Sequence, residues 1–119
     1  MKNKFLYIAF LISLVSCEEV FEPNLSGQKV TLLSPVNNLA TTDTIQTFYW
    51  QPLKGALQYQ LQIVSPRFDS IIRLINDTII STNRVITEMD TGRFQWRVKA
   101  LNSGSESDNS DAWNLKINK

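Results

Sequence analysis

Three acidic side chains in one polar stretch come closest, by type and spacing, to a site that could do chemistry. Glu106, Asp108 and Asp111 all lie within residues 102–111. Oxygen-rich loops hold calcium, but this spacing lacks the central glycine and the terminal bidentate glutamate of an EF-hand. We therefore interpret the stretch as a solvated loop and predict no metal site.

The composition also argues against catalysis. The chain of 119 residues has no histidine and one cysteine, which excludes Ser-His-Asp and Cys-His pairs, internal disulfides and multi-cysteine zinc sites. No carboxylate pair suited to glycoside hydrolysis stands out from the turns and loops that hold the acids. A net charge of +1 makes nucleic acid a poor partner. We expect a non-catalytic protein without a cofactor.

Aromatic and amide side chains offer a possible ligand surface. Tyr49 falls on the opposite face of its segment from Trp50, and Gln58, Gln60 and Gln62 alternate with apolar residues. If the two segments are neighbours, the glutamines would supply hydrogen-bonding groups beside an exposed ring, as a glycan requires. The same pattern is typical of the wet face of any antiparallel sheet. The three tryptophans follow the aliphatic side of their segments, which predicts a core position.

A basic row alternates in the same way. Arg93, Arg97 and Lys99 face away from the apolar side of their segment. They could meet an acidic partner or lipid head groups, but with a nearly neutral chain they are interpreted as the wet face of a strand.

The first seventeen residues form a separate unit. Lys2 and Lys4 precede an eleven-residue run, FLYIAFLISLV, that only Ser13 interrupts. This length suits the apolar centre of a secretion signal and is well short of the roughly 20 residues that cross a bilayer. Without the leader, residues 1–16, the net charge falls from +1 to about −1.

The end of this unit, Leu14-Val15-Ser16-Cys17, resembles the lipobox of bacterial lipoproteins. The resemblance implies cleavage before Cys17, a diacylglycerol on its thiol and an acyl group such as palmitate on its amino group. Glu18 and Glu19 are similar to surface-export signals of some Gram-negative lipoproteins, or they simply begin a linker. We expect residues 17–28 to form the lipidated anchor and tether.

From residue 29 onward the apolar period is two, which indicates strands. Asn76-Asp77 is a turn signal, and a hairpin is expected there. No stretch has a convincing helical period. Six or seven short strands predict an all-β sandwich over residues 29–119. The expected strands cover residues 30–34, 45–51, 58–64, 71–75, 78–81, 93–101 and 112–117.

These strands resemble those of a fibronectin type III domain or a close immunoglobulin-like relative. Trp50-Gln51-Pro52 matches the end of the family's second strand, and Gly55 with Tyr59 matches the following turn and strand. Residues 89–102 match the region of the sixth strand, except that Phe94 replaces the corner tyrosine, whose hydroxyl bond cannot form here. The family has no common enzymatic activity, so the resemblance implies a spacer, an adhesion module or a ligand platform.

Three triplets of aspartate, hydroxyl residue and isoleucine are also present. They resemble the O-glycosylation sequon of exported proteins in some Gram-negative bacteria, with Thr44, Ser70 and Thr78 as the modified residues. Aspartate in turns followed by threonine and isoleucine in strands gives the same triplets without modification.

Together these features predict an outer-membrane lipoprotein, held in the membrane by the lipid on Cys17 and facing either the cell surface or the periplasm. Its function is expected to be non-catalytic, as a binding or structural module for an unknown protein. The alternative is a glycan-binding accessory protein that captures polysaccharide through Tyr49 and the glutamine row.

Replacing the cysteine tests the anchor. Cys17→Ala should abolish incorporation of labelled palmitate and move the protein out of the membrane fraction, since each buried methylene contributes about 0.8 kcal/mol to membrane attachment. Ser16→Ala is the matched control, because another small residue before the cysteine should leave labelling intact. Continued labelling of Cys17→Ala would contradict the prediction.

Overall fold

The computed structural model describes residues 22–119, so the leader, Cys17, Glu18 and Glu19 lie outside the described residues. No α-helix occurs in the described part, and nothing in it could span a membrane as a helix. The eight strands are β1 (Leu32–Ser34), β2 (Leu39–Thr41), β3 (Ile45–Trp50), β4 (Gln58–Arg67), β5 (Ser70–Ile80), β6 (Arg84–Glu88), β7 (Gly92–Leu101) and β8 (Trp113–Ile117).

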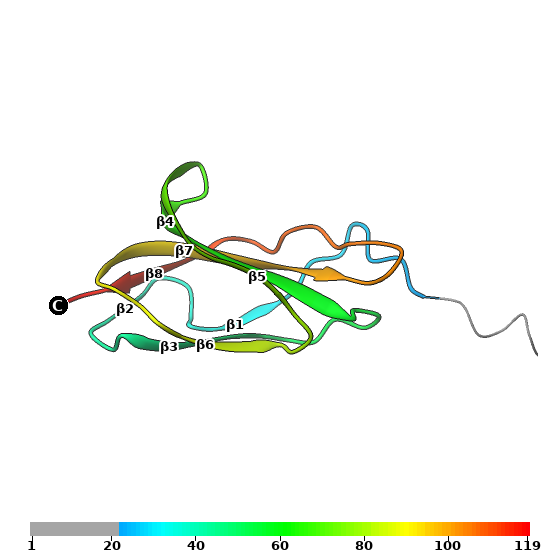
Figure 1. Ribbon diagram of the computed structural model, residues 1–119, viewed down its shortest axis with the longest axis horizontal. Helices are drawn as coiled ribbons and strands as arrows, with labels where there is room; N and C mark the ends of the chain where they lie inside the picture. The colour runs from blue at the N-terminus through cyan, green and yellow to red at the C-terminus, as the bar shows by residue number, and fades with distance from the viewer. Residues whose placement is uncertain (1–21) are drawn as a thin grey trace, which may run out of the picture.

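The strands form two sheets that pack face to face (Figure 1). One sheet has three strands in the order β1-β3-β6, and the other has five in the order β2-β8-β7-β4-β5. Neighbouring strands are antiparallel except β2 and β8, which are parallel. The predicted all-β sandwich is therefore confirmed, with eight strands where six or seven were expected. The short strand β2 and the strand β6 were missed.

Alternation decides which side chains enter the core. Phe94, Trp96, Val98 and Ala100 of β7 are buried, while the residues between them face outward. β4 contributes Tyr59, Leu61 and Ile63 to the same core, and the glutamines between them lie on the outer face. Because the side-chain period of a strand is two, one apolar residue in every pair suffices to cover the inner face.

Aromatic rings join the two sheets. Trp96 of β7 packs edge-on against Phe48 of β3, with ring centroids 5.1 Å apart, and against Trp113 at 6.0 Å. Trp50 of β3 meets Tyr59 of β4 at 5.6 Å, in the edge-to-face arrangement that aromatic pairs prefer. Trp50 and Trp96 are fully buried and Trp113 is half-buried against the core, which confirms the predicted core role of the tryptophans.

The turn expected at Asn76-Asp77 is wrong. Both residues lie within one continuous strand, β5, where Asn76 is opposite Ile63 and Asp77 is opposite Gln62 of β4. The Asp77 carboxylate accepts hydrogen bonds from the amides of Gln60 and Gln62, so cross-strand bonds satisfy a side chain that would otherwise favour a turn. The chain reverses at Phe68-Asp69 instead.

The boundary expected at residue 29 is also placed too late. Leu25, expected in a free tether, is fully buried and belongs to the core. The backbone N–H of Leu25 donates to Ser105 Oγ at 2.9 Å, and the Asn102 amide donates to the carbonyl of Pro23 at 2.8 Å. Gly55 has a φ of +90°, and a Cβ there would meet the Pro23 ring at 2.8 Å. Residues 22–28 are therefore packed on the domain.

Truncating Leu25 tests this assignment. Leu25→Ala should lower the free energy of unfolding by about 2–5 kcal/mol, because it leaves a cavity in a closed core. Urea unfolding of the purified chain carrying Cys17→Ala would measure the change. Leu57→Ala, at a leucine that is 57% exposed, should stay within about 0.5 kcal/mol. If both substitutions changed the free energy of unfolding by the same small amount, residues 22–28 would belong to the tether and not to the domain.

Candidate binding surfaces

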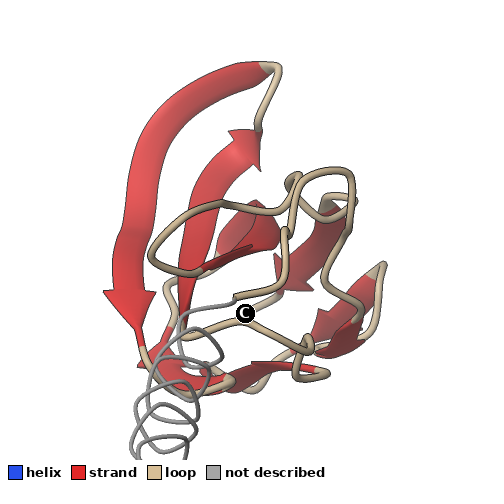
Figure 2. Ribbon diagram, turned by 90° about the vertical axis from the view of Figure 1, so that its right-hand side faces the viewer, coloured by secondary structure: helices blue, strands red, loops and turns tan. Residues whose placement is uncertain are grey.

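The hairpin of β4 and β5 diverges from the rest of its sheet at its tip. β4 pairs with β7 only as far as Val64, whereas its pairing with β5 continues to Arg67 and Ser70. Residues 65–75, here called the hairpin arm, therefore have no second sheet neighbour. Figure 2 shows this hairpin standing away from the two sheets. Register irregularities at Ile63/Val64 and Ser65/Pro66 lie where the arm begins, as expected for bulges that bend a strand.

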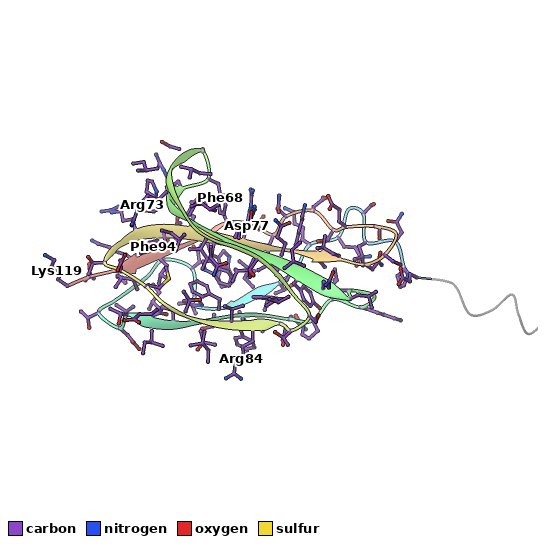
Figure 3. All side chains as sticks on the ribbon, viewed as in Figure 1. Phe68, Arg73, Asp77, Arg84, Phe94 and Lys119 are labelled. Carbon is purple, nitrogen blue, oxygen red and sulfur yellow. The ribbon has the colours of Figure 1, made fainter. Side chains whose placement is uncertain are left out.

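Three contacts hold the arm against the outer face of the five-stranded sheet. The Phe68 backbone N–H donates to Gln95 Oε1 at 3.0 Å, and the Arg97 guanidinium lies 4.0 Å from the centre of the Phe68 ring. Ser65 Oγ donates to the carbonyl of Arg93 at 2.8 Å. Figure 3 labels Phe68 and Arg73 on the arm, close to the end of the molecule that holds Lys119. The arm is therefore a positioned element.

The arm carries apolar side chains in solvent. Ile72 is 79% exposed, and Ile71 and Leu74 are each more than half exposed. Ile79 extends the same exposed strand toward the body of the sandwich. Exposed apolar residues that gather on one element mark interaction sites, whereas single ones are ordinary.

A polar network covers the middle of the same sheet. Gln62 Oε1 accepts from Arg97 Nε at 2.9 Å, and the amides of Gln60 and Gln62 both donate to Asp77. Gln58 is exposed at the start of β4, opposite Leu101. Gln60, Gln62 and Arg97 thus already bond to side chains of neighbouring strands.

The structure does not bring Tyr49 to these glutamines. Tyr49 lies on β3 in the three-stranded sheet, and Gln58, Gln60 and Gln62 lie on β4 in the five-stranded sheet. The prediction that Tyr49 and the glutamines share one surface is wrong, because β3 and β4 belong to different sheets of the sandwich. Tyr49 is indeed exposed, and it shares its outer face with Ile45 and Ile86.

The acidic loop is held by its serines. Ser107 and Ser110 are buried, and their hydroxyls accept from the backbone N–H groups of Ala100 and Val98. The acids next to these serines are exposed, and Glu106 pairs with Lys99 at 3.3 Å while Asp111 pairs with Lys29 at 3.0 Å. Within residues 22–119, no three acidic or sulfur ligands gather around a point that could hold a metal ion.

The three triplets lie in different settings. Thr44 is exposed just before β3, and Ser70 is exposed at the start of β5. Thr78 is half-buried near the end of β5, opposite the buried Leu61. Glycosylation stays a prediction at these positions, and Thr78 is the least accessible of them.

A groove that the sequence did not indicate lies between the arm and the beginning of β7. It has a volume of about 660 Å³ and is walled by Arg67 of the arm, Arg93 of β7 and Lys116 of β8. Asn38, Gln95 and Asn114 also line it. In Figure 1 the chain enters the sandwich at the end opposite to this one, so we call it the distal groove. The alternation of apolar and polar residues along β7, which places Arg93 on the outer face, is the one sequence signal that relates to it.

Comparisons with known proteins identify the fold. No family model and no curated protein matches the chain. The fn3 domain of human collagen alpha-1(XX) chain aligns over 87% of this chain and 93% of its own length, with 13% identity and a TM-score of 0.56. The fibronectin type III domain of human fibronectin type III domain containing protein 3 aligns over 85% and 91%, with 15% identity and a TM-score of 0.51. The fold is therefore fibronectin type III-like.

Removing the Phe68 ring tests whether the arm is held in place. Phe68→Ala should speed amide hydrogen exchange in residues 65–75 by about fivefold, since the lost packing and cation–π contact contribute roughly 1 kcal/mol. Ile72→Ala, on the same arm but solvent-exposed, should leave exchange unchanged. If the two variants exchange alike, Phe68 does not fix the arm.

Proposed function

We propose that this protein is a non-catalytic binding module anchored in the outer membrane by lipid on Cys17, with the hairpin arm as its contact element for a partner protein. The observation that carries the contact assignment is the row of exposed aliphatic side chains on an arm that is itself held in place. A preorganised apolar element loses little conformational entropy on binding, which favours association.

The direction of the arm supports the proposal. The chain enters the sandwich at one end, and the arm and the C-terminus lie toward the other (Figure 1). A lipid at Cys17 would therefore place the arm on the side of the domain that faces away from the membrane. Leu25 and its neighbours are packed on the domain, so few residues remain between Cys17 and the folded part, and the domain would be held close to the bilayer.

β5 could also bind a partner by pairing with a further strand at its open edge, but the bulges in the β4–β5 ladder disfavour this. β5 is the last strand of its sheet, and its ladder with β4 is interrupted at two places. Bulges twist an edge away from regular pairing. Side-chain contact through Ile71, Ile72 and Leu74 therefore fits the arm better than addition of a further strand.

Site-specific crosslinking in intact cells tests the arm. A photoreactive residue at position 72 should give a discrete adduct, and Leu74→Asp in the same chain should reduce that adduct by about tenfold or more, because a charge placed in an apolar contact is strongly unfavourable. The control is the photoreactive residue at position 86, which is 61% exposed on the opposite sheet. Adducts of equal yield at 72 and 86, or none at 72, would overturn the assignment.

A further inference from the structure

Two cations face each other across β7 and β8. Arg93 is directly opposite Lys116 in the antiparallel ladder, next to the inward-facing pair Phe94 and Leu115. Both cations therefore lie on the outer face of the sheet, where opposite residues have their Cβ atoms about 4.5–5.5 Å apart. Like charges in this arrangement repel each other and destabilise the sheet unless an anion lies between them.

No acid of the described chain neutralises this pair. Arg93 and Lys116 take part in none of the ion pairs among residues 22–119, which are Lys29–Asp111, Arg67–Asp69 and Lys99–Glu106. The whole chain has 12 basic and 11 acidic residues, so an excess of cations does not account for the unpaired cluster. Among the residues that the structure describes, no carboxylate lines the distal groove.

A third cation reaches the groove from the arm. Arg67 lies on the groove wall and pairs with Asp69 only loosely, at 3.4 Å and with both side chains well exposed to solvent. Such exposed pairs contribute little and exchange partners readily. Arginine binds carboxylate, sulfate and phosphate oxygens through its planar set of donors.

The floor beside the cations is a row of amides. Gln95 donates to Asn114 Oδ1 at 2.9 Å, and Asn114 donates to Asn38 Oδ1 at 3.1 Å. Each amide nitrogen has two N–H groups, so these bonds leave one or more donors free on every member. A row of fixed amides next to cations suits a ligand that carries hydroxyl groups as well as an anionic group.

The position of the groove favours a saccharide over an acidic peptide. The groove runs over the face of the sheet, across β2, β8 and β7, and β8 is paired with a strand on each side. An extended peptide gains its affinity from main-chain bonds along a sheet edge, and β2, the outer strand beside the groove, offers an edge of three residues only. Its volume of about 660 Å³ lies within the range of small-ligand sites, about 300–1,000 Å³.

We propose that the distal groove binds an acidic saccharide, with its carboxylate or sulfate group between Arg93 and Lys116 and its hydroxyl groups on the amide row. The site goes beyond the proposed protein-binding role and uses neither Tyr49 nor the glutamines of β4. It faces away from the end at which the chain enters.

Calorimetric titration of the full lipidated chain in detergent micelles tests the proposal. The probes are trigalacturonate, sulfated maltotriose, neutral maltotriose and a pentaglutamate peptide. At least one acidic saccharide should bind, maltotriose and the peptide should bind at least tenfold more weakly, and added salt should reduce the affinity. Binding of trigalacturonate alone, of sulfated maltotriose alone or of both identifies the anionic group.

Substitutions locate the site. Arg93→Gln with Lys116→Gln should weaken binding by about tenfold or more, since a charge-assisted hydrogen bond contributes roughly 1.5–3 kcal/mol. Lys116→Glu should abolish binding and raise the urea midpoint, because it replaces repulsion across the ladder by attraction. Arg84→Gln, on the three-stranded sheet, is the control and should change the affinity less than twofold.

Several outcomes overturn the proposal. They are absence of binding to both acidic saccharides, equal binding of pentaglutamate, or unchanged affinity in the Arg93 and Lys116 variants. The two functions are separable, because Leu74→Asp should leave the saccharide titration unchanged and Lys116→Glu should leave the adduct at position 72 unchanged. Failure of one test therefore does not decide the other.

Discussion

The sandwich depends on edge-on aromatic contacts between its layers, because Trp96 with Phe48 and Trp50 with Tyr59 join the five-stranded sheet to the three-stranded one. These contacts are favoured even though the indole N–H groups of Trp50 and Trp96 find no acceptor within residues 22–119. An unsatisfied buried donor costs about 1–3 kcal/mol. Burying 150–250 Å² of tryptophan surface contributes about 4–6 kcal/mol, so burial exceeds that cost.

The divergence of the neighbouring strands β4 and β7 creates both candidate surfaces. β4 and β7 pair only as far as Val64, and β4 and β5 then continue together as the arm. Since the arm bends back until Phe68 reaches Gln95 and Arg97, it becomes one wall of the distal groove while its aliphatic side chains remain in solvent. One hairpin thus presents exposed aliphatic side chains and also forms one wall of a groove that three cations line.

The sequence predicted what depends on local alternation and missed what depends on pairing. The two-residue period of residues 93–101 was sufficient to assign β7 and the buried positions of Phe94 and Trp96. The pairing of one strand with another cannot be derived from either segment alone. Asn76-Asp77 has the composition of a turn, yet its pairing with β4 keeps it in a strand. For the same reason the sequence does not show that Tyr49 and the glutamines of β4 lie in different sheets, that Leu25 enters the core, or that Arg93 lies opposite Lys116.

The docking of residues 22–28 has a mechanical consequence. Leu25, Gln28 and Pro23 are bonded to the 102–108 loop, at the end of the sandwich opposite to the distal groove. A force between a partner bound at the far end and a membrane anchor would act along the long axis of the sandwich. It would act on these hydrogen bonds and on the buried Leu25 side chain before it acted on the strands. The first element to yield would be the N-terminal segment, which would lengthen the tether while leaving both sheets folded.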